Sequence, residues 1–458
     1  MSVTRTLAEF TADYKYEDIP QQMLSQAKRC IIDSLGCAIG GSATTLGKTI
    51  VRSVKALKGP KQSIIIGDGS KVGCNEASFV NTLSANLLDF DDSAPALGHP
   101  GNTIIPPSLA VGEVVNASGK DILLAVVLGY EVSLRIGDGI RPTRERMKLV
   151  YPIGCFQTYG AVVAASKLLK LDANQIVSAF GIAGSGAPLP MSMPMFSRRP
   201  VGYMKIAIGF ASNTGVLAAL MAKEGTPYYT EVFDSEGLWI MAGSDSCDHN
   251  AMVADLGSKY WINTISFKPY PSSAWGHSAS KAVAKIVTEQ KLNPEDIKSI
   301  TVKLVAPAVL PDRNPRGMFD REFSLPWNLA MVILGEPPGP RWFIEDKIDD
   351  PKVRSLLDKI TVEEGEEATR LFFSSKGYVI RATVDIVTND GKTFTEQIDY
   401  PKGHEQDPFT DEELKGKFRT LALPVLGTQK TEKVIAIVDK LEELDRIGKL
   451  TNLLRGKV

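Results

Sequence analysis

The sequence predicts a mainly α-helical protein with an α+β part, in which a smaller α+β lid domain is inserted into a large all-helical domain. Apolar residues recur at helical spacing through the first half of the chain. Apart from a short strand or extended segment at Ser63–Ile66, strand patterns and a hairpin turn appear only after Lys268, and helical signals return near the C-terminus. The 458 residues are too many for one ordinary core, so two or more domains are expected.

The first quarter of the chain is expected to contain several helices. Helical spacing covers residues 4–39, and Gly40-Gly41 is expected to end the second helix. A helix near 47–57 and a short extended segment at Ser63–Ile66 follow. Asn75 is then expected to cap a helix that leads into an acidic cluster.

Between residues 106 and 210 the pattern predicts one helix after another. Apolar stripes cover roughly 107–117, 121–136, 156–169 and 174–183, which is typical of a helical bundle. A Gly-, Met- and Arg-rich segment at 184–200 precedes a helix that starts at Lys205. This segment is neither a Walker loop nor a dinucleotide fingerprint, so no nucleotide binding is expected.

The region after Lys268 changes character. Residues 300–304 alternate as a half-buried strand, and residues 378–398 form a hairpin pattern around Asn389-Asp390-Gly391. A capping box at 410–413 starts the final helices. These signals predict a helical segment at 1–266, an α+β lid domain at 267–401, and C-terminal helices at 402–458 that return to the helical domain.

The composition favours a cytoplasmic protein without nucleic-acid or membrane partners. The 52 basic and 53 acidic residues leave a net charge of −1, which gives no bulk attraction to polyanions. The N-terminus has no apolar signal core. The five cysteines are scattered without a C-x-x-C pair, so neither a zinc site nor an iron–sulfur cluster is expected.

A polar cluster at residues 89–101 is the first candidate site. It contains Asp89, Asp91, Asp92, Ser93 and His99, and the histidine stands between Gly98 and Pro100. Carboxylates close to a histidine suit proton transfer. Each polar residue could instead cap a helix or turn the chain, and the spacing matches no defined metal-ligand motif.

A second candidate lies in the connector at residues 267–277. Its prolines make it stiff, and it carries Lys268 and His277 at the expected domain boundary, where ligand sites often occur. Alone, it is as well explained as a rigid linker with an ordinary solvated lysine.

The two candidate segments together resemble the MmgE/PrpD family. The resemblance rests on L-D-F-D-D…H-P-G at residues 88–101 and K-P-Y-P…H at 268–277, and on the motifs at 160–169, 204–213 and 400–403. This family includes 2-methylcitrate dehydratases, cis-aconitate decarboxylases and iminodisuccinate epimerases. The resemblance implies a helical domain with an inserted lid, a homodimer, and no metal or organic cofactor.

The resemblance also implies the site residues. The family's pocket positions fall on Asp89, Ser93, His99, Lys205, Lys268 and His277. Decarboxylase-type members have a histidine where this chain has Tyr151, and another where it has Ser272-Ser273. These differences argue against decarboxylation. Ser93 replaces a common threonine and keeps the hydroxyl.

The residue types suit removal of a proton from carbon next to a carboxylate. We expect Lys205 and Lys268 to stabilise the carbanion, with Ser93 and Ser273 contributing hydroxyl groups. Arg198 or Arg199 is a candidate to bind a second carboxylate, although a surface position is the better expectation for each arginine. His99 is the expected proton-transfer group, because its ordinary pKa is near neutrality, and Asp89 is expected either to orient it or to act beside it. Tyr151 is a candidate acid for a leaving hydroxyl or a packing residue, and His277 either donates to the substrate or holds the linker.

The expected function is therefore a cofactor-independent hydro-lyase acting on a di- or tricarboxylate such as 2-methylcitrate. An epimerase of an iminodisuccinate-like dicarboxylate, a cis-aconitate decarboxylase-like enzyme, and a non-catalytic binding homologue are the alternatives. A metal-dependent hydrolase that uses Asp89, Asp91 and Asp92 is a more remote one.

Overall fold

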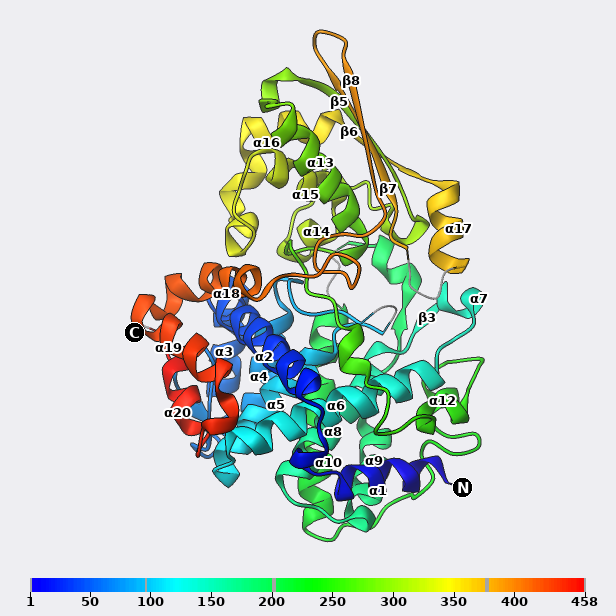
Figure 1. Ribbon diagram of the computed structural model, residues 1–458, viewed down its shortest axis with the longest axis vertical. Coiled ribbons are helices and arrows are strands. Elements are labelled where there is room, and N and C mark those ends of the chain that lie inside the picture. Colours follow the sequence, from blue (N-terminus) through cyan, green and yellow to red (C-terminus); the bar gives the residue numbers. More distant parts are fainter. Residues whose placement is uncertain (1, 95–96, 200–202, 375–378, 457–458) are drawn as a thin grey trace.

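The computed structural model describes residues 2–94, 97–199, 203–374 and 379–456. It has a large helical lobe and a smaller α+β lobe, called the lid below, which lies at the upper end of the molecule in Figure 1. The predicted fold class, mainly α with an α+β part, is confirmed.

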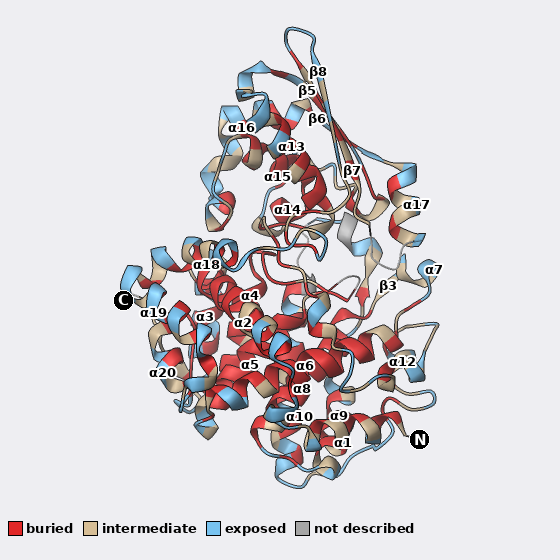
Figure 2. Ribbon diagram, in the orientation of Figure 1, coloured by how far each residue is buried: buried red, intermediate tan, exposed pale blue. Residues whose placement is uncertain are grey.

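The helical lobe is built from long helices whose centre is fully buried (Figure 2). Helix α8 contacts both α6 and α10, and residues 153–166 of α8 are all buried. A helix that is apolar on every side needs neighbours all round, which explains its central place. The lobe comprises α1 (Val3–Asp13), α2 (Gln21–Ser42), α3 (Thr45–Lys55), α4 (Cys74–Asn86), α5 (Pro100–Val115), α6 (Gly119–Gly139), α8 (Ile153–Leu168), α9 (Ala173–Gly186) and α10 (Tyr203–Lys223), and near the end of the chain α18 (Asp411–Leu426), α19 (Thr428–Asp439) and α20 (Gly448–Thr451).

The helical lobe also contains shorter elements. These are α7 (Arg144–Met147), α11 (Leu238–Met241), α12 (His249–Val253), and the antiparallel pairs β1 (Ser63–Ile64) with β2 (Lys71–Val72) and β3 (Val150–Tyr151) with β4 (Met191–Ser192). The second pair interrupts a region for which only helices were predicted.

The prediction that Gly40-Gly41 ends the second helix is wrong, because α2 continues to Ser42. Helices α2 and α4 contact each other at this point. A Cβ atom on Gly41 would lie 1.9 Å from the carbonyl oxygen of Ser84 in α4. The glycine therefore permits close helix packing rather than a helix stop.

The lid contains a four-stranded sheet in the order β6-β5-β7-β8. The strands are β5 (Ile297–Leu304), β6 (Ile360–Glu364), β7 (Ala382–Thr388) and β8 (Thr393–Ile398). The predicted hairpin is present as β7 and β8, with Ile386 opposite Phe394. Strand β6 was not predicted, and it pairs in parallel with β5.

Helices cover this sheet and complete the core of the lid. Helix α13 contacts β7, β8 and α15. The lid helices are α13 (His277–Glu289), α14 (Met318–Glu322), α15 (Leu325–Ile333), α16 (Pro351–Lys359) and α17 (Glu366–Ser374). Leu88, Phe90 and Leu421 of the helical lobe belong to the same hydrophobic cluster as the lid residues, so the two lobes share apolar packing.

Two backbone contacts join the segments that run between the lobes. Ser93 and Ser266 form a reciprocal bridge, with both N–H···O distances at 2.9 Å. The next residue, Phe267, donates its N–H to the carbonyl of Gly403 at 3.1 Å. The acidic cluster, the lysine connector and the start of the C-terminal segment are thereby held side by side.

Over Lys205–Lys223, α10 is long and apolar enough to cross a bilayer, and among the described residues the bent pair of α2 and α3 passes the same test when taken together. In α10, 61% of the apolar stretch is buried inside the fold. Core helices of globular proteins have the same properties.

Candidate active site

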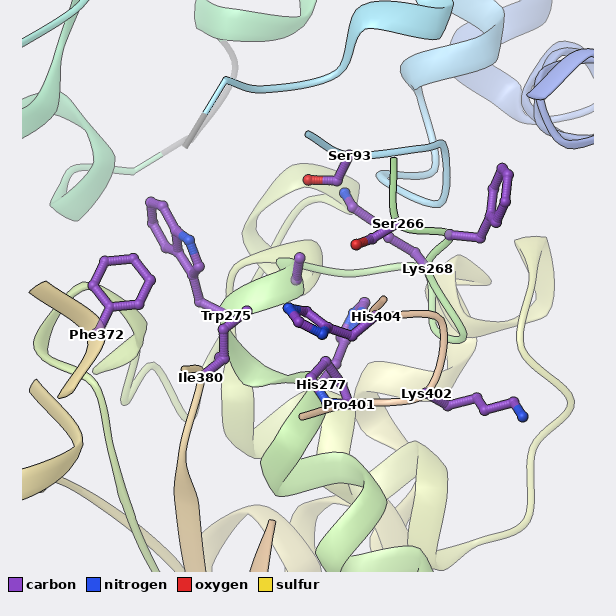
Figure 3. Close-up of a pocket in the computed structure, with 12 residues that line it drawn as sticks. Ser93, Ser266, Lys268, Trp275, His277, Phe372, Ile380, Pro401, Lys402 and His404 are labelled. Atoms are coloured by element: carbon purple, nitrogen blue, oxygen red, sulfur yellow. The ribbon is translucent and has the colours of Figure 1, made fainter. Parts of the chain in front are cut away.

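A pocket lies where the lid, the connector and the C-terminal segment meet the helical lobe (Figure 3). Ser93 and Lys268 line it from one side, and His277 and Trp275 from the lid. The complete lining is Ser93, Ser266, Phe267, Lys268, Ala274, Trp275, His277, Phe372, Ile380, Pro401, Lys402 and His404. Three of the predicted residues, Ser93, Lys268 and His277, therefore share this pocket.

Asp89 is the centre of a buried ionic cluster next to the pocket. Helix α4 ends at Asn86, and Asp89 follows in the left-handed region, with φ 47°. Aspartate tolerates this conformation better than most residues. One carboxylate oxygen lies 2.9 Å from Lys205 Nζ and the other 2.9 Å from Lys268 Nζ.

The two lysines are fixed by further acceptors. Lys205, near the start of α10, donates to the carbonyl of Asn86 at 2.8 Å, at the C-terminus of α4. Lys268 donates to the Asp89 carbonyl at 3.0 Å as well as to its carboxylate. Both side chains are almost completely buried. Because an ammonium group has three donors, Lys268 has one more donor than these two contacts use.

The charges of this cluster determine its pKa values. Burial alone would raise the pKa of Asp89, but Lys205, Lys268 and His99 outweigh burial and hold it well below its ordinary value. Burial would lower the pKa of Lys205, whereas Asp89 and Glu322 raise it above the usual range. Asp89 is therefore a carboxylate and Lys205 an ammonium ion at neutral pH.

Glu322 is a member of the cluster that the sequence did not reveal. It ends α14, and its carboxyl lies 3.0 Å from Lys205 Nζ. Burial raises the pKa of Glu322 to about 8, although Lys205 opposes the shift. Near neutrality Lys205 and Lys268 thus face the full carboxylate of Asp89, and the carboxylate of Asp91 lies close by, so the positive and negative charges are nearly balanced.

His99 is oriented by Asp91, which corrects the expectation that Asp89 orients it. Its Nδ1 lies 3.0 Å from Asp91 Oδ2 and 3.2 Å from the Asp92 carbonyl. The amides of Asn86 and Asn102 donate to Asp91 at 3.2 and 2.5 Å. Burial would raise the pKa of Asp91, but His99 and Lys268 hold it below its ordinary value.

The loop before α5 explains how His99 reaches this position. Gly98 has φ +74°, and a Cβ atom there would lie 2.2 Å from Ile153 Cδ1. Pro100 occupies the first turn of α5, where a missing N–H costs nothing. His99 is therefore held rigidly. It is absent from the described pocket lining, and its ring lies beside Asp89 and Asp91.

Asp92 differs from its two neighbours. It accepts hydrogen bonds from Tyr130 Oη at 2.6 Å and from the Gly101 N–H at 3.1 Å. Burial raises the pKa of Asp92 to about 8, and the charge of Asp91 adds to the shift, against the effect of the Tyr130 hydrogen bond. Asp92 is therefore mainly uncharged at neutral pH and fixes the turn ahead of α5.

His277 lines the pocket as a neutral imidazole. Burial lowers the pKa of His277 to about 3, and the charge of Lys268 lowers it further. Its Nε2 lies 3.1 Å from Ser272 Oγ, and Tyr270 packs against the ring edge-on. A neutral imidazole can donate a hydrogen bond to a substrate oxygen without carrying charge.

Four other predicted residues are not among the described residues that line the pocket. Tyr151 is half-buried on β3, opposite Met191. Ser273 is buried, and its N–H donates to the Glu322 carbonyl. Arg198 and Arg199 are exposed, and Arg199 lies 3.0 Å from Asp312 and 3.6 Å from Asp320. Their predicted roles stay predictions.

Asp89, Asp91 and His99 offer three possible metal-ligand atoms within 4.8 Å of one another. Both oxygens of Asp89 are already paired with lysine ammonium groups at 2.9 Å. A divalent cation would meet two positive charges at contact range, so this set fits a metal poorly. The arrangement fits an anionic ligand better.

Comparisons with known proteins identify the family of the chain. The chain matches the MmgE/PrpD N-terminal domain over residues 5–249 and the MmgE/PrpD C-terminal domain over residues 270–443. It is 28% identical to the cis-aconitate decarboxylase of Homo sapiens, over 99% of this chain and 95% of that protein. It is 27% identical to the cis-aconitate decarboxylase of Aspergillus terreus (strain NIH 2624 / FGSC A1156), over 100% and 96% of the two chains.

A decarboxylase is a lyase, so these relatives agree with the prediction that the protein is an enzyme of this class. The two domain matches together cover most of the chain and carry the assignment. The chain belongs to the MmgE/PrpD family.

Proposed function

We propose that the protein is a cofactor-independent hydro-lyase that acts on a small di- or tricarboxylate of the 2-methylcitrate type. The observation that carries the proposal is the buried cluster of Asp89, Lys205 and Lys268, in which Lys268 is fixed by Asp89 and lines the pocket. Preorganised positive charge of this kind stabilises the negative charge that develops when a proton leaves carbon next to a carboxylate.

Each group has a distinct role in this reaction. Lys268 and the hydroxyl of Ser93 bind the substrate carboxylate next to the reacting carbon. Asp91 holds Nδ1 of His99, so His99 exchanges the proton through Nε2. The electron pair of the broken C–H bond forms the C=C bond as the C–O bond breaks, and the departing hydroxyl takes the proton that His99 has gained and leaves as water. The neutral imidazole of His277 donates a hydrogen bond to the departing oxygen.

The apolar part of the pocket supports a substituted substrate. Trp275, Phe372 and Ile380 line the same space as Lys268 and His277. An apolar wall stabilises a methyl group by about 0.8 kcal/mol for each buried carbon. This wall favours 2-methylcitrate over citrate.

Decarboxylation is the second candidate, and the relatives named cis-aconitate decarboxylase favour it. The same cationic cluster would stabilise the carbanion left after carbon dioxide departs. The family resemblance implies histidines in decarboxylase-type members where this chain has Tyr151 and Ser272-Ser273, and this difference favours dehydration instead.

Ultraviolet absorbance tests the proposal. Chelator-treated protein is mixed with citrate, 2-methylcitrate and cis-aconitate, with His99→Ala in parallel and carbon dioxide release measured on the same samples. We expect absorbance from a new conjugated double bond with 2-methylcitrate, and none in the variant. Carbon dioxide release from cis-aconitate without dehydration would favour decarboxylation. No absorbance change and no carbon dioxide release with any of the substrates would refute both dehydration and decarboxylation.

The family resemblance further supports a homodimer in the cytoplasm, which we include in the proposal. An exposed apolar stripe on α10 offers a surface that a second copy can cover: Ile206, Phe210, Leu217 and Met221. Light scattering after size-exclusion chromatography should give twice the mass of the chain, and a Phe210→Glu variant should give the single mass. A monomeric wild type would refute this part.

A further inference from the structure

His404 lies in the segment Tyr400-Pro401-Lys402-Gly403-His404, to which no role has been assigned so far. This segment follows β8 and leads back toward the helical lobe. The side chain of His404 lines the pocket together with Lys268 and His277 (Figure 3). His404 is only 7% exposed, so its imidazole is part of the buried pocket wall.

The turn that carries His404 is fixed by its backbone. The Gly403 N–H donates to the Asp407 carbonyl at 2.8 Å, and the Asp407 N–H donates to the His404 carbonyl at 2.9 Å. Gly403 has φ +88°, and a Cβ atom there would lie 1.8 Å from the carbonyl oxygen of Phe267. Only glycine allows the turn to approach the segment that carries Lys268.

The ring of His404 is fixed as well. Its Nδ1 accepts the N–H of Gln406 at 3.2 Å, so in the neutral imidazole the proton is on Nε2. The ring of Tyr400 stacks on it, with centroids 4.8 Å apart and planes at 28°. The Gln406 hydrogen bond therefore favours the Nε2–H tautomer, and the Tyr400 contact helps to set the plane of the ring.

We propose that His404 is a substrate-binding residue that donates its Nε2–H to a carboxylate oxygen of the bound substrate. The choice of a carboxylate rests on the proposed function. Lys268 binds one carboxylate, and His404, on the neighbouring segment, binds a second one. A substrate with at least two carboxylates then fits the pocket, and a monocarboxylate loses one of the two contacts.

The alternative is that His404 only completes the turn through its contact with Gln406. Two variants separate these roles. In His404→Asn the side-chain amide oxygen can still accept the Gln406 N–H, but the distal donor is lost. In His404→Gln the amide N–H₂ can reach the position of Nε2, but the contact with Gln406 is lost. His249→Asn on α12, outside the described pocket lining, is the matched control.

The experiment measures binding of tricarballylate, which has three carboxylates and no hydroxyl group to eliminate. Calorimetric titration gives its Kd for wild type and each variant, and thermal unfolding gives Tm. We expect His404→Asn to weaken binding about 10- to 100-fold, the loss typical of a hydrogen bond to a charged group. His404→Gln should bind more tightly than His404→Asn, and His249→Asn should match wild type.

The inference is overturned if wild type does not bind tricarballylate, or if His404→Asn binds it like wild type. It is also overturned if His404→Gln binds more weakly than His404→Asn and has the lower Tm of the two. Failure of the proposed function is a separate result. A wild type that binds through His404 but turns over no hydroxy acid would refute the lyase and leave the binding role intact.

Discussion

Replacing Asp89 by Asn should destabilise the protein strongly, because Asp89 is the counter-ion of two buried lysines. Its oxygens lie 2.9 Å from Lys205 Nζ and 2.9 Å from Lys268 Nζ, and all three side chains are buried. Breaking a buried ion pair by removing one partner costs about 3–5 kcal/mol. An asparagine retains one acceptor oxygen and turns an amide N–H₂ toward the other ammonium group. Glu322 can offset part of the loss by ionising beside Lys205. We expect a net loss of about 3 kcal/mol in the free energy of unfolding.

Urea denaturation at neutral pH, followed by circular dichroism, measures this loss. Asp255→Asn is a matched control, because Asp255 also has a positive φ, at 57°, but forms an exposed ion pair with Lys259. The control should change stability little. The double variant Asp89→Asn, Lys268→Met should be more stable than the sum of the two single changes predicts, because it also removes the unpaired charge. Equal, small effects of Asp89→Asn and Asp255→Asn would refute the reasoning.

Three further predictions follow from the site. Burial raises the pKa of Glu322 to about 8, from an ordinary 4.5, so the folded state binds a proton that the unfolded state loses first. The free energy of unfolding should therefore fall between about pH 4.5 and 8. Glu322→Gln should reduce the slope of this free energy against pH by about 1.4 kcal/mol per pH unit in urea denaturation. An unchanged slope in the variant would contradict the prediction. Asp91→Asn should lower kcat about 100-fold or more and alter the pH profile of kcat, since Asp91 holds Nδ1 of His99. Asp92→Asn should change kcat only a few-fold below pH 8, because Asp92 is already uncharged there. Equal losses in steady-state assays of these two variants would count against the assignment. Turnover should persist after treatment with chelator, because the ammonium groups beside Asp89 disfavour a divalent ion. Activity that chelator abolishes and added metal restores would contradict this prediction.

The fold class followed from the sequence because its signals are local. Helical spacing before residue 210 and the Asn389-Asp390-Gly391 turn each act within a few residues. Strand β6 was missed because it is short and pairs in parallel with β5, about 60 residues earlier in the chain. Gly41 was misinterpreted because the reason for it, the Ser84 carbonyl of α4, is a tertiary contact.

Only part of the candidate site could be predicted from the sequence. Asp89, Lys205 and Lys268 were identified and the structure brings them together. The partner of His99 was misassigned, because the backbone after α4 turns Asp89 toward the lysines and Asp91 toward the imidazole. Glu322 carries no motif of its own, and its role depends on burial beside Lys205. His404 follows Tyr400-Pro401-Lys402-Gly403, and that motif was the one signal that could have pointed to it.

Deuterium exchange tests the central claim most directly, because dehydration, epimerisation and decarboxylation all require proton transfer at carbon next to a carboxylate. Chelator-treated protein is incubated in heavy water with 2-methylcitrate and with cis-aconitate, and proton NMR follows the C–H signals of substrate and product. With wild type, the account predicts that the C–H signal is lost as product forms or is replaced by deuterium in recovered substrate. It predicts neither change with His99→Ala, provided that the variant keeps the wild-type Tm. Substrates recovered without deuterium and without product, from a protein that binds tricarballylate, would contradict it and identify the site as one that binds carboxylates without acting on them.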